Sequence, residues 1–240
     1  MISFVVPAHN EELLIGRTLD AIRSAAEQVG EPYEIVVVDD DSSDRTGTIA
    51  REHGASVVRV AHRQIGRTRN AGAQASTGDT LIFVDADTII SAATLTATMR
   101  AIQEGAVAGG AELRLDGQLP WHGWVLLWLV RTGMRLGRLA AGCYLFCTRA
   151  AFEGAGGFDE RLYASEEIAL SRALARQGRV VILRETVESS GRKLRTHSGW
   201  EILTLMSAVA RQGSRALRSR EHLELWYGRR RSDPGHRLNR

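Results

Sequence analysis

Two aspartates, Asp85 and Asp87, stand directly after the apolar run Leu81–Val84. Short runs rich in β-branched and aromatic residues are typical of buried strands, so the two carboxylates are expected at the end of a strand. Carboxylate oxygens bind hard divalent cations, and Mg²⁺ or Mn²⁺ needs only one or two of them when substrate phosphates supply further ligands. The alternative is a polar loop in which Asp87 caps the next helix. These residues alone favour neither interpretation.

Two more polar clusters follow apolar runs in the same way. Pro7–Glu12 comes after 2–6, and Asp39–Ser43 comes after 34–38. The carboxyl ends of parallel strands meet at one edge of a sheet, and ligands bind there. Together with Asp85 and Asp87, these clusters predict a nucleotide or phosphate site at that edge.

The elements that must position these residues alternate along the first 104 residues. We expect strands at 2–6 (stopped by Pro7), 34–38, 55–60 and 80–84. We expect helices at 11–29 (capped by Asn10), 45–53 (capped by Asp44), 66–76 and 92–104 (capped by Ser91). This alternation predicts an α/β fold of βαβ units, with a mostly parallel central sheet covered by helices on both faces.

The second half of the chain has a different pattern. We expect strands at 106–116, 142–147 and 179–184, and helices at 121–139, 164–178 and 198–218. Helix 121–139 has a Trp/Leu face and an Arg face, which fits either a core helix with one exposed side or a helix lying at a membrane interface. From residue 219 the chain is polar and Arg-rich, so we expect a flexible basic tail at 219–240.

Composition indicates one soluble globular domain. The 240 residues are 44% hydrophobic and 25% charged, and the two cysteines, Cys143 and Cys147, form neither a zinc pattern nor a disulfide framework. We find no signal peptide and no apolar run long enough to span a membrane, so we expect a cytoplasmic protein. Residues 211–240 carry nine arginines against three acidic residues, whereas the whole chain has a net charge of only +3. Such a basic end is either solvated or binds an anionic surface such as a membrane.

Five motifs in order resemble those of the family 2 glycosyltransferases, which have the GT-A fold. They are VVPAHNEE at 5–12, VDDDSSDRT at 38–46, GRTRNAG at 66–72, GDTLIFVDAD at 78–87 and GGFDE at 156–160 followed by EEIAL at 166–170. Asp41 and Arg45 stand where the family usually has glycine. The resemblance covers residues 2–180. It implies a Rossmann-like αβα sandwich and a single domain at 1–218, with a nucleotide-binding half at 1–104 and an acceptor-side half at 105–218.

The resemblance also implies an inverting transferase that moves a sugar from a nucleotide-diphosphate sugar to a hydroxyl acceptor, which could be lipid-linked. We expect a UDP-sugar first and a GDP-sugar second. The residues implied to bind the nucleotide are Pro7, Ala8, Glu11, Asp40, Arg67 and Asp85. Arg67 and Arg69 both lie on a helix expected to start near the same strand ends, and the alternative for either arginine is a solvated helix face. Asp85 and Asp87 would hold Mg²⁺ or Mn²⁺, and His197 is a weaker candidate beside the metal. The sequence does not say which of the two aspartates is the main metal ligand.

Glu166 and Glu167 match the acidic pair whose second member is the family's general base. The match falls on Glu167, where the family has the shorter aspartate, so Glu166 remains an alternative. Two neighbouring carboxylates can raise the pKa of one of them. The structural alternative is that both acids stabilise the first turn of a helix capped by Ser165.

Two other functions would use some of the same residues. A nucleotidyltransferase would use similar metal chemistry, but it would need a Gly-rich, basic phosphate loop after the first strand, where this chain has His9–Glu12. A non-catalytic sugar-nucleotide binder or membrane adaptor, attached through helix 121–139 and the basic tail, would not need Asp85, Asp87 and Glu167. No nucleic-acid partner is expected.

Overall fold

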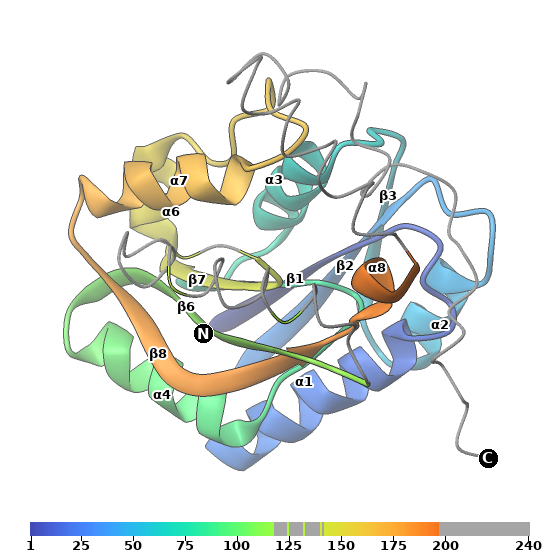
Figure 1. The fold of residues 1–240 in the computed structure, drawn as a ribbon, viewed down its shortest axis with the longest axis horizontal. Helices are drawn as coiled ribbons and strands as arrows, with labels where there is room; N and C mark the ends of the chain where they lie inside the picture. The colour runs from blue at the N-terminus through green and yellow to red at the C-terminus, as the bar shows by residue number, and fades with distance from the viewer. Residues whose placement is uncertain (118–123, 125–131, 133–139, 141, 197–240) are drawn as a thin grey trace.

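The computed structural model describes residues 1–117, 124, 132, 140 and 142–196, and they form a central sheet between two layers of helices (Figure 1). The strands are β1 (Ile2–Ala8), β2 (Tyr33–Asp40), β3 (Ser56–Val60), β4 (Thr80–Val84), β5 (Thr88–Ile89), β6 (Ala106–Leu115), β7 (Tyr144–Thr148) and β8 (Arg179–Ser189). The helices are α1 (Ile15–Val29), α2 (Thr46–Glu52), α3 (Ile65–Ala75), α4 (Ala92–Gln103), α6 (Arg149–Ala155), α7 (Glu166–Ala175) and α8 (Arg192–Thr196).

The sheet has the strand order β3-β2-β1-β4-β7-β6-β8-β5. Strands β3, β2, β1 and β4 are parallel neighbours, and β6 is parallel to β8. Strand β7 is antiparallel to both β4 and β6, and β5 is antiparallel to β8. The mostly parallel sheet expected from the sequence is therefore confirmed.

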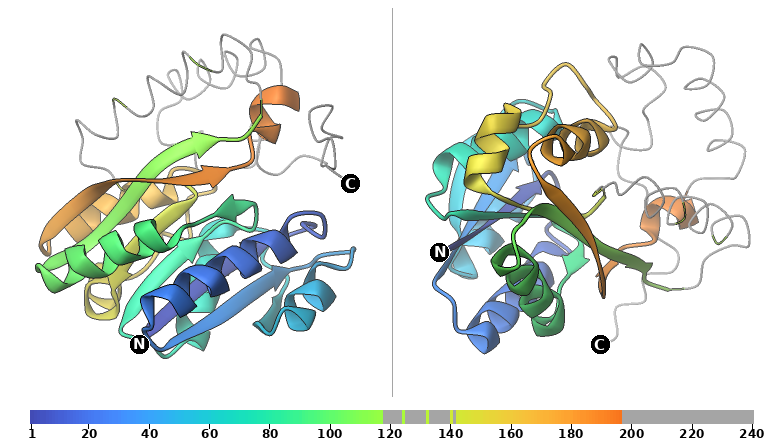
Figure 2. Two further views of the ribbon diagram at one scale, coloured as in Figure 1. Left: turned by 90° about the horizontal axis from the view of Figure 1, so that it is seen from below. Right: turned by 90° about the vertical axis from the view of Figure 1, so that its left-hand side faces the viewer.

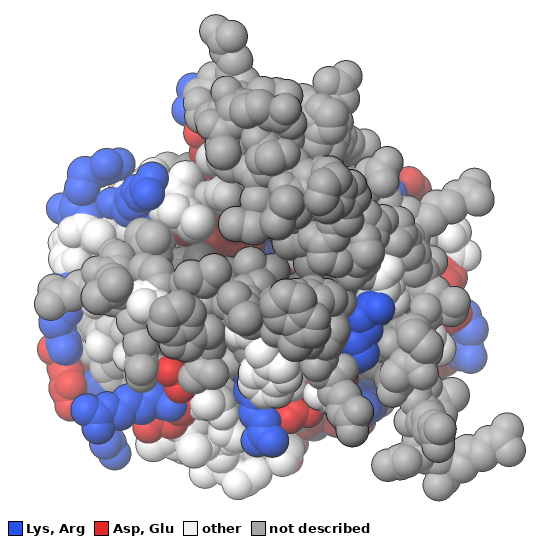
Figure 3. All heavy atoms as spheres, viewed as in Figure 1, with Lys and Arg blue, Asp and Glu red and all other residues white. Residues whose placement is uncertain are grey.

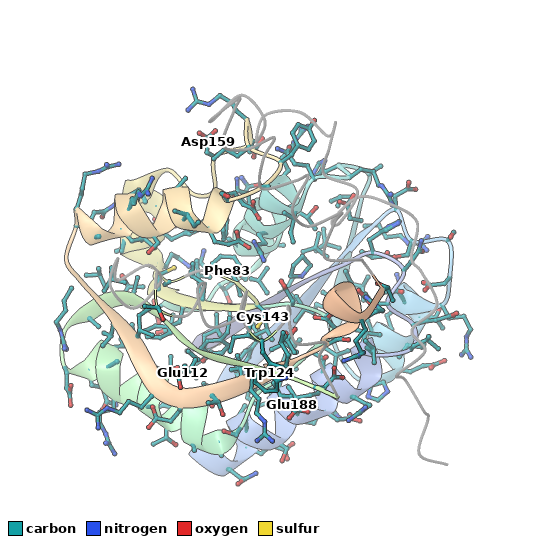
Figure 4. All side chains as sticks on the ribbon, in the orientation of Figure 1. Phe83, Glu112, Trp124, Cys143, Asp159 and Glu188 are labelled. Carbon is teal, nitrogen blue, oxygen red and sulfur yellow. The ribbon has the colours of Figure 1, made fainter. Side chains whose placement is uncertain are left out.

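Each face of the sheet has its own apolar core. One core joins the strands to α1, α2 and α4, through residues such as Leu19, Ala50 and Leu95. The other joins them to α3, α6 and α7, and here the Phe83 ring lies 5.4 Å from Phe152 and 5.0 Å from Phe158, centroid to centroid. Phe83 is labelled in Figure 4. The two helix layers on opposite sides of the sheet are visible in Figure 2. This is the expected αβα sandwich.

Strand β1 and helix α1 begin and end differently from the prediction. Strand β1 continues through Pro7, because its pairing with β4 ends at Val5 and Pro7 is aligned only with Val38 of β2. A proline is tolerated where no ladder hydrogen bond is required of its nitrogen. Helix α1 begins at Ile15 and not at residue 11. Asn10 has a positive φ of 52° and does not cap this helix; its side chain accepts a hydrogen bond from the Ser43 amide.

Other local predictions have mixed outcomes. Ser91 caps α4 as expected, and the Asp44 carboxylate accepts from the Thr46 amide at the start of α2. Ser165 has a positive φ of 63° and makes no side-chain cap on α7, so that prediction is wrong. Strand β8 extends to Ser189, beyond the predicted end at 184, because it remains paired with β6 along its length.

Three short elements were not predicted: β5, α6 and α8. Helix α8 begins at Arg192. The predicted helix at 198–218, the tail at 219–240 and His197 lie outside the described residues. Within 121–139 the structure describes only Trp124 and Thr132, and the Trp124 side chain is exposed.

Candidate active site

Strands β1 and β2 bring their predicted site residues to one edge of the sheet. Pro7 and Ala8 are buried at the end of β1, and Ala8 is aligned with Asp39 of the neighbouring strand. Asp40 is the last residue of β2 and is also buried. Adjacent parallel strands thus place Pro7, Ala8 and Asp40 together, as the polar strand ends predicted.

The Asp40 carboxylate accepts three hydrogen bonds from the protein. Oδ1 accepts from the amides of His62 at 2.7 Å and Arg63 at 2.8 Å, and Oδ2 accepts from the Thr68 hydroxyl at 2.7 Å. These bonds hold the connection between β3 and α3 against the end of β2. Asp40 therefore shapes this edge of the sheet through its own partners, a role that the sequence did not indicate.

Asp41, which stands where the family usually has glycine, has a backbone conformation that glycine favours. Asp41 has a φ of 60°, in the left-handed region that glycine favours and aspartate tolerates. Nearby, a Cβ at Gly47 would lie 2.5 Å from Oδ2 of Asp39, so glycine is required where α2 approaches this carboxylate. The loop thus packs closely around the buried Asp39.

Arg69 connects the two acidic clusters. Its Nη2 donates to Oδ1 of Asp85 at 2.8 Å, and its Nη1 donates to Glu166 at 3.0 Å and to Glu167 at 2.9 Å. Its side chain is only 2% exposed, and its guanidinium carbon lies 5.3 Å from the centre of the Phe158 ring. Burial opposes the charged form, but the surrounding carboxylates of Glu167, Asp85 and Glu166 outweigh it and raise the pKa of Arg69, so the guanidinium stays charged.

Arg67, the arginine assigned to the nucleotide from the sequence, lies elsewhere on the same helix. Its Nε pairs with Glu160 at 3.3 Å, and both side chains are about half exposed. Residues two apart on a helix point about 200° apart, so only one of Arg67 and Arg69 can face the strand ends. The signal for Arg69 was its helical spacing from Gly66, Gly72 and Ala73, which form the buried face of α3.

The two glutamates have different surroundings. Glu166 is 3% exposed and Glu167 is 17% exposed. Burial, followed by the charge of Glu167, raises the pKa of the Glu166 carboxyl well above its usual value of 4.5, although Arg69 opposes this shift. Glu166 is thus biased toward its neutral form, and Glu167 is the more accessible of the two carboxylates.

Asp85 and Asp87 offer oxygen ligands at the end of β4. Asp85 is 27% exposed, and its amide donates to the Cys143 carbonyl at 3.0 Å. Asp87 accepts from the Ser189 hydroxyl at 3.2 Å and lines a small pocket with Thr18 and Asp116. In the described part of the chain, no group of three His, Cys, Asp or Glu could hold a metal by itself. A pair of accessible carboxylates still fits Mg²⁺ or Mn²⁺, which take further oxygens from substrate phosphates and water.

Glu11 forms a buried ion pair with α8. Nη2 of Arg192 lies 3.1 Å from Oε1 of Glu11, and both side chains are mostly buried. Helix α8 is also attached to the end of β6, because Arg195 donates to the Asp116 carboxylate at 2.9 Å. These contacts bring Arg192 beside a residue that the sequence assigned to the nucleotide pocket.

Asn70, the residue after Arg69, binds the backbone of the loop that leads to α7. Its side-chain amide donates to the carbonyl of Phe158 at 3.0 Å and accepts from the Phe158 amide at 2.9 Å. Gly157, the residue before Phe158, has a φ of 71°. Helix α3 therefore holds both the acidic residues, through Arg69, and the loop that leads to α7, through Asn70.

Comparison with known proteins identifies the family. Residues 3–147 match the family model described as glycosyl transferase family 2, and the chain belongs to that family. Over 97 residues it is 38% identical to an undecaprenyl-phosphate 4-deoxy-4-formamido-L-arabinose transferase of Pectobacterium carotovorum, a match that covers 36% of this chain and 28% of the relative. The matches cover 24% and 28% of the first two curated relatives, and 62% of an uncharacterized glycosyltransferase of Mycobacterium tuberculosis that is 31% identical over 142 residues.

Two solved structures share the fold. The mannosyltransferase of Pyrobaculum calidifontis, in complex with GDP-Man and Mn²⁺, has a TM-score of 0.67 at 19% identity, covering 86% of this chain and 60% of that one. Residues 1–349 of TarS from S. aureus, in complex with UDP-GlcNAc, have a TM-score of 0.65 at 18% identity, covering 95% and 73%. The GT-A architecture is thus confirmed.

No helix among the described residues is long and apolar enough to cross a membrane.

Proposed function

We propose that the protein transfers a sugar from a nucleotide-diphosphate sugar to a hydroxyl acceptor, with inversion at the anomeric carbon. The observation that carries this proposal is the convergence of Asp85, Glu166 and Glu167 on Arg69 in a chain of this family. Displacement of a nucleoside diphosphate from a sugar requires one carboxylate that can bind a metal ion and, close to it, another that can act as a general base. The solved neighbours that hold GDP-Man or UDP-GlcNAc support a nucleotide-sugar donor.

The donor side is assigned to the ends of β1, β2 and β4. Pro7, Ala8 and Asp40 would surround the nucleoside, with Glu11 and Arg192 beside it. Asp87 and Asp85 would hold Mg²⁺ or Mn²⁺, which when bound neutralises charge on the diphosphate. We favour a UDP-sugar as donor and a GDP-sugar second. Arg67 remains a proposed contact only if its pair with Glu160 opens.

Glu167 is our choice for the general base. It would take the proton of the acceptor hydroxyl while that oxygen bonds to the anomeric carbon and the bond from this carbon to the diphosphate oxygen breaks. The nucleoside diphosphate then leaves, and no covalent sugar–enzyme intermediate forms. Glu167 is preferred to Glu166 because it is more exposed and because the raised pKa of Glu166 leaves that group protonated more often.

Release of UDP or GDP from a panel of sugar nucleotides, with Mn²⁺ and a set of hydroxyl acceptors, tests this assignment. We expect Glu167→Ala to lower kcat by about 10²–10⁴-fold, the usual contribution of a general base. Glu104→Gln, at the exposed end of α4, is the matched control and should leave kcat unchanged. Release of pyrophosphate would favour a nucleotidyltransferase, and nucleotide binding without turnover would favour a non-catalytic binder.

The metal assignment has a test of its own. We expect UDP or GDP with Mn²⁺ to raise the melting temperature, and EDTA or Asp87→Asn to remove the effect, because the diphosphate shares the cation with the carboxylates. Asp20→Asn, on the exposed surface of α1, is the control. Stabilisation that EDTA leaves unchanged would count against a metal at Asp85 and Asp87.

An acceptor attached to a lipid is supported by the relative named for its undecaprenyl-phosphate substrate. A chain with a basic end, acting beside the inner face of a membrane, would suit such an acceptor. This part of the proposal concerns residues 121–139 and 211–240, which lie almost entirely outside the described structure.

A further inference from the structure

We propose that Arg69 is a positioning residue that couples the metal-binding carboxylate Asp85 to the general base Glu167. The inference rests on the proposed function, because it names the group that sets the geometry between the donor side and the acceptor side. Arg69 itself touches neither the sugar nor the acceptor in this proposal. It acts through the carboxylates that do.

The guanidinium of Arg69 holds carboxylates at both of its terminal nitrogens. Asp85 is bound by Nη2, whereas Glu166 and Glu167 are bound by Nη1, at distances between 2.8 and 3.0 Å. A guanidinium is planar and rigid, so its two ends keep a constant separation. Asp85 at the end of β4 and Glu167 in the first turn of α7 therefore cannot change their relative position without moving Arg69 or breaking one of these contacts.

Arg69 is itself held firmly. Helix α3 packs so closely on the sheet that a Cβ at Gly72 would lie 2.3 Å from Cγ1 of Val5. The Phe158 ring covers the guanidinium, and the Arg69 side chain is almost completely buried. A buried fork on a tightly packed helix is a fixed reference for the carboxylates around it.

The arrangement around Arg69 is unfavourable as a purely structural contact. One buried guanidinium faces three carboxylates, and Nε of Arg69 has no hydrogen-bond partner within the described residues. Burying an unpaired donor and excess negative charge costs stability. Local violations of this kind are expected where function requires them.

Kinetics provide the first test. Arg69→Lys keeps the charge but loses the two-ended fork, so the carboxylates lose their common alignment. We expect kcat to fall by about 100-fold, the effect of a displacement of about 1 Å at a reacting group, while KM for the donor changes less than about 3-fold. Arg179→Lys, at the start of β8 with its exposed partner Glu104, should change neither constant by more than about 2-fold. Equal losses in kcat and donor affinity would overturn the proposal.

A binding measurement without turnover provides the second test, with Mn²⁺ and UDP as the probe in titration calorimetry. We expect Glu167→Gln to change the affinity for Mn²⁺–UDP by about 5-fold or more in the wild-type background, and by less than about 2-fold in the Arg69→Lys background. Loss of the Glu167 charge has the same direct electrostatic effect on Mn²⁺–UDP in both backgrounds. The difference between the two changes in affinity therefore measures the part of the effect that depends on Arg69. The same change in both backgrounds would overturn the coupling.

A third measurement covers the case in which Arg69→Lys does not fold. With Arg69 intact, Asp85→Asn, Glu167→Gln and the double variant are unfolded in urea. We expect a non-additive effect on the free energy of unfolding, because both carboxylates share one guanidinium; additivity would overturn the proposal. If wild-type protein turns over no donor, the proposed function fails, while the unfolding cycle still decides the coupling.

Discussion

Glu166 and Glu167 are adjacent in sequence, yet the protein treats their carboxylates differently. Residues next to one another on a helix point about 100° apart, so α7 turns Glu166 into the protein and leaves Glu167 nearer the surface. Arg69 donates to both from a single nitrogen. The buried member carries the raised pKa, and this makes it a source of pH-dependent stability.

The pH dependence has a definite sign. A carboxyl whose pKa is raised by folding contributes its stabilisation fully below its usual pKa and loses it as the pH rises through the higher, folded value. Glu166→Gln cannot ionise, so we expect its melting temperature relative to wild type to rise by roughly 4 °C or more between pH 5 and pH 9. One pKa unit is about 1.4 kcal/mol, and a domain of this size shifts by about 2–4 °C per kcal/mol.

Thermal melts of both proteins across this range check the expectation. Glu104→Gln, at the exposed end of α4, serves as the control, and its difference from wild type should stay flat. A flat difference for Glu166→Gln as well would contradict a raised pKa at this position.

Single residues were predictable where the chemistry lies in a local motif. Asp85, Asp87, Glu166 and Glu167 stand out because paired acids follow a strand or open a helix. The pairing of Arg69 with those acids was not predicted, because Arg69 becomes their common neighbour only after β4 and α7 have been folded against α3. The three bonds to Asp40 escaped prediction for the same reason, since their donors come from another connection of the sheet.

At the scale of elements, helix α3 does more than cover the sheet. Its Gly72 lets the helix approach β1 and β2, its Arg69 holds the acidic residues, and its Asn70 holds the loop at Phe158. The depth at which α3 packs therefore determines where Arg69 stands.

We expect Gly72→Ala to destabilise the protein by about 1–3 kcal/mol, because the new methyl group would lie 2.3 Å from Val5 and 2.8 Å from Val38. Gly66→Ala on the same helix is the matched control. Its methyl group would meet nothing closer than 3.5 Å, so it should be neutral or stabilise by up to about 1 kcal/mol. Urea unfolding of both variants measures the difference. Equal stabilities would contradict the close packing of α3.

Elements with strong periodicity were predicted well, and short ones were not. Strands β1–β4 and helices α1–α4 follow from apolar runs and helical spacing. Strand β5 has two residues and exists only through its pairing with β8, and α8 has five residues and is attached by the Arg192 and Arg195 ion pairs. Short elements that form only through contacts with residues distant in sequence have no local sequence pattern that would predict them.

The whole molecule combines a body of mixed charge with a basic end. On the face seen in Figure 3, the described Lys and Arg side chains are interspersed with Asp and Glu. Nine of the arginines lie in residues 211–240, against three acidic residues. We propose that this end adds an electrostatic attraction to anionic lipid, which would serve a lipid-linked acceptor.

Flotation with vesicles that contain anionic lipid tests this proposal. Each arginine near such a surface contributes about 1 kcal/mol, so replacing Arg229, Arg230 and Arg231 with glutamine should weaken binding by roughly 100-fold at low salt. Replacing the body residues Arg45, Arg51 and Arg59 instead should have little effect. The two variants should become alike in about 0.5 M salt, because screening removes the attraction. Equal binding of both variants at low salt would count against the basic end.

Strand β7 lies between β4 and β6, and this has a consequence for the order in which the protein is made. When the ribosome has synthesised β4, one edge of that strand pairs with β1, but the other edge waits for residues 144–148. An open, apolar strand edge invites pairing with other chains. The nascent chain therefore passes through an interval of exposure between β4 and β7, and a chaperone acting during translation would have its greatest effect on yield there.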